Sequence, residues 1–111
     1  MLLELESKDN NLIVRLEGEL DHHSSESARQ KIDRRFLEEN LNNIVLDLRK
    51  LTFMDSSGIG LVMGRYKKAM ERHGELVIVN DNEYIDKILN MSGLLKIVEL
   101  YSTLDKAMEK L

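Results

Sequence analysis

The chain has 111 residues, a net charge of −4, and neither cysteine nor proline. This length and a hydrophobic content of 42% suffice for one modest core, so we expect a single domain over residues 1–111. The lack of cysteine excludes disulfides, thiolate catalysis and cysteine-bound zinc. Apolar runs are too short for a signal sequence or a membrane span, and lysine and arginine form no basic stripe. We therefore expect a cytoplasmic protein that binds neither membranes nor nucleic acid.

The first half of the chain predicts a hairpin, a helix and a buried strand. Residues 2–6 and 12–17 have the alternating pattern of strands and are separated by turn residues, so they should pair as antiparallel neighbours. Residues 25–40 carry apolar side chains at helical spacing, which predicts an amphipathic helix on one face of a sheet. Residues 44–48 form a nearly continuous apolar run, which is typical of a central parallel strand.

The second half repeats the alternation of helix and strand. A helix is expected to start after residues 53–60 and to end near His73 and Gly74, and a strand should follow at 75–80. The remaining elements are a helix at 81–93, a last strand within 94–100 and a final helix at 102–111. Gly74 is the residue expected to end the first of these helices in a left-handed conformation. The order is β-β-α-β-α-β-α-β-α, which predicts an α/β fold with a mixed, mostly parallel sheet and an antiparallel first strand at its edge.

The stretch from Phe53 to Gly60 is distinctive because an apolar run ends in an acid, two hydroxyls and two glycines. Its simplest interpretation is the start of a helix, with Asp55 or Ser56 accepting hydrogen bonds from free N–H groups. A cap needs only one short polar side chain, so at least one hydroxyl should be free and exposed. A phosphate there would add about −1.5 to −2 charge at the positive end of a helix. Such a modification should block docking of a partner more than it unfolds the domain.

A serine hydrolase is one competing interpretation of this stretch. Neither Ser56 nor Ser57 lies in the Gly-x-Ser-x-Gly pattern of a nucleophile elbow. His22 and His23 are the candidate bases, but the sequence identifies no acid that would orient either of them.

Asp21, His22 and His23 are contiguous and lack the spacing of metal ligands, so we expect them to form a surface loop and not a metal site. Ser24, Ser25 and Asp21 are each candidates to cap the following helix.

A small nucleotide-binding domain is the other alternative. The glycines from Gly58 to Gly64 resemble a dinucleotide fingerprint at the start of a helix, and Asp81 follows about twenty residues later. The last glycine, however, lies one residue later than the pattern requires, and the chain is too short for two nucleotide-binding halves. No Walker-type phosphate loop is present.

Residues 18–23 together with residues 53–60 resemble the STAS family, and within it the antagonists of anti-sigma factors, most closely those of sporulation. The likeness continues through residues 64–67 and 91–97, so it covers essentially the whole chain. It implies a single STAS-type domain and a regulatory, non-enzymatic role in partner switching. An antagonist in a stress-response sigma factor circuit is the alternative within the same family.

In that family the unmodified antagonist binds an anti-sigma factor that is also a serine kinase, and the sigma factor is released. The kinase uses ATP to phosphorylate the first serine of the Asp-Ser-Ser-Gly motif, which corresponds to Ser56, and a PP2C-type phosphatase removes the phosphate. The resemblance thus makes Ser56 a substrate residue of a protein that is monomeric when free and needs no cofactor. Asp55 and Ser57 would help to hold the turn while Ser56 faces the partner. The partner-binding residues that it implies are Asp21, His22, His23, Asp55, Ser56, Ser57 and Gly58.

Overall fold

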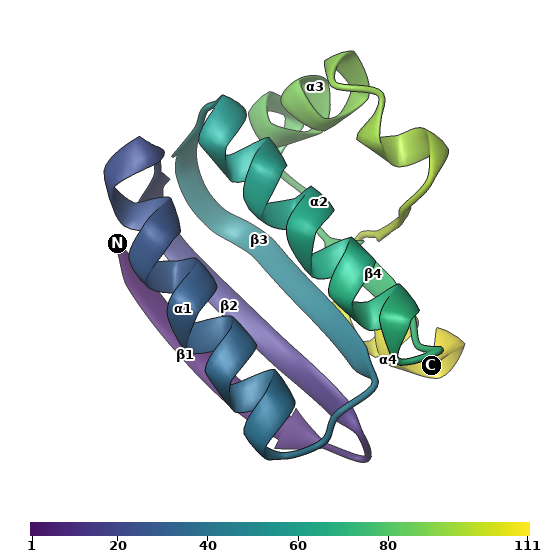
Figure 1. The fold of residues 1–111 in the computed structure, drawn as a ribbon. Helices are drawn as coiled ribbons and strands as arrows, with labels where there is room; N and C mark the ends of the chain where they lie inside the picture. Colours follow the sequence, from purple (N-terminus) through teal and green to yellow (C-terminus); the bar gives the residue numbers. More distant parts are fainter.

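The computed structural model describes residues 1–111 and contains one five-stranded sheet in the order β1-β2-β3-β4-β5 (Figure 1). β1 is antiparallel to β2, whereas the other neighbouring strands are parallel. The predicted element order, with an antiparallel strand at one edge, is confirmed. The strands are β1 (Leu2–Lys8), β2 (Asn11–Leu20), β3 (Asn43–Met54), β4 (Leu76–Val79) and β5 (Glu99–Tyr101).

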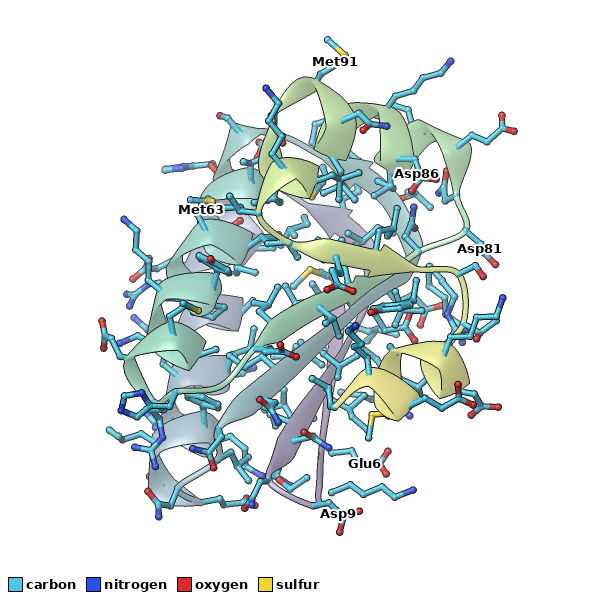
Figure 2. All side chains as sticks on the ribbon, turned by 90° about the vertical axis from the view of Figure 1, so that its right-hand side faces the viewer. Glu6, Asp9, Met63, Asp81, Asp86 and Met91 are labelled. Atoms are coloured by element: carbon cyan, nitrogen blue, oxygen red, sulfur yellow. The ribbon has the colours of Figure 1, made fainter.

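The helices divide unequally between the two faces of the sheet. They are α1 (His22–Glu38), α2 (Ser56–Glu71), α3 (Glu83–Met91), the short 3-10 helix η1 (Leu94–Lys96) and α4 (Leu104–Lys110). Each parallel connection moves one place along the sheet in the same direction, and such crossovers are right-handed, so α1, α2 and α3 lie on one face. Their residues Ile32, Leu61 and Ile85 pack into the main core with Val14 and Leu46 of the strands. α4 covers part of the opposite face, where Figure 2 shows it in yellow beside the sheet. None of these helices is both long enough and apolar enough to cross a membrane.

Three boundaries differ from those expected. β3 continues beyond the predicted residues 44–48 to Met54, because its second half pairs with the end of β2 through an irregular register. α1 begins at His22, so part of the segment expected to be a polar loop is helical. The last strand has only three residues, and η1 occupies the start of the predicted 94–100 segment.

The end of α2 corrects the role expected of Gly74. His73, with a φ of 61°, is the left-handed residue after the helix. His73 N–H donates to Met70 O at 3.0 Å and Gly74 N–H donates to Ala69 O at 2.9 Å, which is the pattern of a Schellman motif. Gly74 is needed for a different reason, because a Cβ on this residue would lie 1.8 Å from the backbone oxygen of Asn42. Its role is close packing of two chain segments.

Replacing His73 with glycine should stabilise the domain. A side chain at positive φ is strained, and glycine removes this strain, although it also increases the entropy of the unfolded chain. We expect a net gain of about 0.5 kcal/mol in the free energy of unfolding. Urea denaturation of the two proteins would measure it. A loss of stability in His73→Gly would show that the imidazole makes a favourable contact that outweighs the strain.

Candidate functional site

The carboxyl ends of β2, β3 and β4 each run into a capped helix, so three helix N-termini collect at one end of the sheet. Asp21 caps α1, Asp55 caps α2 and Asn82 caps α3. Asn82 Nδ2 also donates to Leu51 O at 3.1 Å, which ties the start of α3 to β3. Sites in α/β sheets form at this end, where strands are followed by helices. The predicted site residues at positions 21–23 and 55–58 lie there.

Ser56 is the first residue of α2, and its side chain is exposed. The cap is made by the preceding residue: Asp55 Oδ1 accepts from Ser57 N–H at 2.9 Å, and Asp55 O accepts from Gly58 N–H at 3.0 Å. The Ser56 hydroxyl makes no hydrogen bond within the chain. Asp55 therefore holds the turn, as expected, and leaves the Ser56 hydroxyl free at the surface.

Ser57 is half-buried and faces a different way. Its Oγ lies 3.4 Å from His22 Nδ1 on α1. Both residues line a groove of about 560 Å³ between α1 and α2, together with Arg29 and Arg65. Ser57 contributes to the turn through its backbone N–H, whereas its hydroxyl points into this groove. The two serines, adjacent in sequence, thus have different surroundings.

Asp21 fixes the first turn of α1 through a reciprocal pair of hydrogen bonds. Asp21 Oδ1 accepts from Ser24 N–H at 2.8 Å, and Asp21 N–H donates to Ser24 Oγ at 3.0 Å. The hydrogen bonds from the Ser24 backbone and then its hydroxyl hold the pKa of Asp21 below its usual value. Asp21 is therefore the cap, whereas Ser24 and Ser25 lie inside the helix. His22 and His23 are exposed residues of this first turn, which corrects their expected position in a loop.

Asp21→Ala should lower the midpoint of thermal unfolding by a few degrees, because it leaves N–H groups of α1 without an acceptor. Asp21→Asn is the matched control, since an amide oxygen can replace the carboxylate as a cap. The lowered pKa means that the stabilisation from Asp21 is present above its unfolded pKa and is lost as the pH falls through the lower, folded value. Equal midpoints for Asp21→Ala and the wild type at neutral pH would contradict a capping role.

The glycines of α2 serve different purposes. A Cβ on Gly58 would lie 2.4 Å from Met54 Cγ and 3.1 Å from Leu20 Cδ2, so this buried residue lets the start of the helix pack closely on the sheet. Gly60 and Gly64, in contrast, have nothing within 4 Å of an added Cβ. All three lie within α2, whereas a dinucleotide fingerprint requires its first glycines in the turn before the helix. Direct contact of Gly58 with a partner stays a prediction.

A buried ion pair joins the two helices on either side of the groove. Arg65 Nε lies 2.8 Å from Asp33 Oδ1, and only 4% of Arg65 is exposed. Burial lowers the pKa of Arg65, while Asp33 acts in the opposite direction. No pattern considered in the sequence predicts this pair. The sequence does contain an indication of it, because Arg65 is a charged residue on the buried face of α2, between Leu61 and Ala69.

The residues around His22 do not assemble a hydrolytic or metal centre. The serine near His22 is Ser57, and neither imidazole nitrogen is hydrogen-bonded to a carboxylate. His23 makes no contact of this kind with either serine. No three histidine, aspartate or glutamate side chains converge closely enough to hold a metal ion, so the Asp21-His22-His23 trio is not brought together as ligands.

These features define a small α/β domain with a free serine hydroxyl at the capped start of a helix. Residues 3–107 match the STAS domain family. The chain belongs to this family.

Two relatives extend the comparison to almost the whole chain. The anti-sigma F factor antagonist of Paenibacillus polymyxa is 41% identical over 109 residues, which cover 98% of this chain and 93% of the relative. The anti-sigma-B factor antagonist of Bacillus subtilis (strain 168) is 26% identical over 98 residues, which cover 88% of each chain. The sequence is thus similar to antagonists of two sigma factor circuits, with the higher identity to the sigma F type.

Solved structures agree with this assignment. The anti-sigma factor antagonist SpoIIAA in its unphosphorylated form has a TM-score of 0.86 and 32% identity, over 98% of this chain and 95% of that one. The Bacillus cell fate determinant SpoIIAA in its phosphorylated form has a TM-score of 0.78 and 32% identity, over 98% of both chains. The chain therefore has the fold of a protein that has been described with and without phosphate.

Proposed function

We propose that this chain is an anti-sigma factor antagonist that controls sporulation-specific transcription by partner switching. Its unphosphorylated form binds an anti-sigma factor that is also an ATP-dependent serine kinase, and the sigma factor is released. Phosphorylation of Ser56 by that kinase ends the interaction, and a PP2C-type phosphatase restores the binding form. The observation that carries the proposal is that Asp55 makes the cap while the Ser56 hydroxyl stays free and exposed.

The position of Ser56 suits a switch that acts on docking and leaves the fold intact. A phosphate at the first residue of α2 lies near free N–H groups and the positive end of the helix dipole, which compensate part of its charge. It also adds charge beside Asp55 at an exposed surface, where a closely packed partner would meet it. A phosphate on Ser57 would instead enter the groove beside His22, Arg29 and Arg65. Ser56 is therefore the better placed of the two to repel a partner.

The proposed docking surface extends from Ser56 along one face of α2. Ile59 and Met63 follow Ser56 at helical spacing, and both are only partly buried. Figure 2 shows Met63 projecting from α2. We include Asp21, His22 and His23 at the neighbouring start of α1, since Asp55 N–H approaches Leu20 O within 3.4 Å. A polar rim around a few apolar contacts is the usual composition of a protein interface.

The greater similarity to the sigma F antagonist supports a sporulation circuit. A stress-response circuit is the second candidate, supported by the similarity to the sigma B antagonist. In either circuit we propose that the chain acts in the cytoplasm, where an anti-sigma factor and RNA polymerase meet, and that it is a monomer before it binds. Reconstitution with the anti-sigma F and anti-sigma B factors of the same organism would distinguish them, because only the cognate factor should form a stable complex.

The central test is to incubate the chain with its anti-sigma factor and ATP and to locate any added phosphate by mass spectrometry. We expect one phosphate, on Ser56, and none after the PP2C-type phosphatase is added. Ser56→Ala should remain unmodified. Phosphate on Ser57 in the wild type would overturn the site assignment, and the absence of any phosphate would overturn the proposed mechanism.

A further inference from the structure

The first turn of α1 is held rigidly by its own hydrogen bonds. Besides the reciprocal pair between Asp21 and Ser24, Ser24 Oγ donates to Glu19 O at 2.9 Å and Ser25 Oγ donates to Asp21 O at 2.6 Å. Ser25 is buried, which limits its alternatives. His22 is the first residue of this turn, so its backbone position is well determined.

The start of α2 packs closely on the sheet at Gly58 but makes few hydrogen bonds to other elements. The backbone contact to the end of β2 runs from Asp55 N–H to Leu20 O at 3.4 Å. The register between β2 and β3 is irregular between Gly18 and Glu19, just before these strands end. The contact between His22 Nδ1 and Ser57 Oγ, also 3.4 Å, is the one polar side-chain contact between the first turns of α1 and α2. His22 therefore links a rigid turn to the turn that carries Ser56.

The chemistry of this contact suits a positioning role. Imidazole nitrogen and hydroxyl oxygen can each donate or accept, so the pair can keep one hydrogen bond in more than one protonation state. The contact directs the Ser57 hydroxyl toward the groove between α1 and α2. It also restrains the backbone directly after Ser56. Transfer of a phosphoryl group depends steeply on the placement of the attacking hydroxyl.

We propose that His22 is a positioning residue for the modification of Ser56, acting through Ser57 Oγ. The expected effect on phosphorylation rests on the proposed function. The expected effect on the first turn of α2 does not. His22 holds the first turn of α2 in the geometry in which the Ser56 hydroxyl is presented, and it keeps the Ser57 hydroxyl directed toward the groove between α1 and α2. Loss of this contact should slow phosphoryl transfer to Ser56 without removing the cap made by Asp55.

The first measurement needs no kinase. Amide hydrogen exchange at Ser57 and Gly58 should be about fivefold faster in His22→Ala than in the wild type, because the first turn of α2 opens more often. His23→Ala is the matched control, since His23 lies in the same turn of α1 without a contact to Ser57, and its exchange should equal that of the wild type. Ser57→Ala should match His22→Ala, and the double variant should add nothing further. Unchanged exchange in His22→Ala, or equal acceleration in His23→Ala, would overturn the inference.

The second measurement uses the anti-sigma kinase and ATP. For His22→Ala we expect kcat for phosphorylation of Ser56 to fall about tenfold, because the hydroxyl is placed less precisely. Any rise in KM would come in addition to this fall, since His22 also lies in the proposed docking surface. His22→Asn should recover most of the rate, since its side chain can place a polar atom close to the position of Nδ1. A rise in KM alone, or no recovery by His22→Asn, would overturn the positioning role. If the kinase fails to modify the wild type, the proposed function fails, and the exchange measurement still decides the structural inference.

Discussion

Gly74→Ala should destabilise the domain by roughly 2–4 kcal/mol, the largest effect on folding expected here of a change outside the apolar core. The added Cβ would lie 1.8 Å from Asn42 O and 2.5 Å from Asn42 C, which are backbone atoms that cannot rotate away. Asn42 is itself held in place, because its Nδ2 donates to Arg72 O at 2.9 Å. Relief of the clash therefore requires the ends of α1 and α2 to move apart. Urea denaturation followed by circular dichroism would measure the loss.

Gly64→Ala is the matched control for this prediction. Gly64 has nothing within 4 Å of an added Cβ and lies inside α2, where glycine is less favourable than alanine. We expect this variant to gain about 0.5–1 kcal/mol in the free energy of unfolding. The two substitutions have the same chemistry and opposite expected signs. Equal effects of Gly64→Ala and Gly74→Ala would show that the approach of Gly74 to Asn42 does not decide the outcome.

Ser56→Asp should weaken binding to the anti-sigma factor at least about 100-fold, which corresponds to about 2.7 kcal/mol. The exposed carboxylate would add charge beside Asp55, where the proposed interface is closely packed. Ser56→Ala should bind within about threefold of the wild type, because the free Ser56 hydroxyl makes no hydrogen bond within the chain. Isothermal titration calorimetry with the purified anti-sigma factor would measure both affinities.

Stability measurements separate this effect from misfolding. Ser56→Asp places an acid at the first position of α2, where negative charge is favourable, so its unfolding midpoint should not fall. A folded Ser56→Asp variant that bound as tightly as the wild type, and left sigma factor activity in cells unchanged, would refute the switch mechanism.

The sequence predicted the fold well because its local signals agreed with one another. The apolar runs at residues 44–48 and 75–80 and the helical spacing between them defined parallel strand-helix units, and the structure contains them. Boundaries were less predictable. Arg49 and Lys50 interrupt the apolar pattern of β3, yet the strand continues because it pairs with β2. Pairing between distant segments is not visible in a local pattern.

The candidate site was predictable in its motif and less so in its contacts. The series Asp55, Ser56, Ser57 identified a helix start and a surplus hydroxyl, and the structure shows which residue makes the cap. Sequence alone could not distinguish the surroundings of the two serines, because these depend on where α1 lies beside α2. The contact between His22 and Ser57 joins residues 35 positions apart in the chain. Such contacts follow from helix packing, which no spacing rule in a single sequence describes.

The antiparallel pairing of β1 has a practical consequence for labelling. Leu2 pairs with Glu17, and a Cβ on Gly18 would lie 3.5 Å from Met1 Cα, so the amino terminus emerges at the end of the sheet that carries Asp21 and Ser56. Leu111 follows α4, on the opposite face of the sheet (Figure 1). An affinity tag or fluorescent protein attached to Met1 would stand beside the incoming anti-sigma factor. Fusions and surface immobilisation should therefore use the carboxyl terminus.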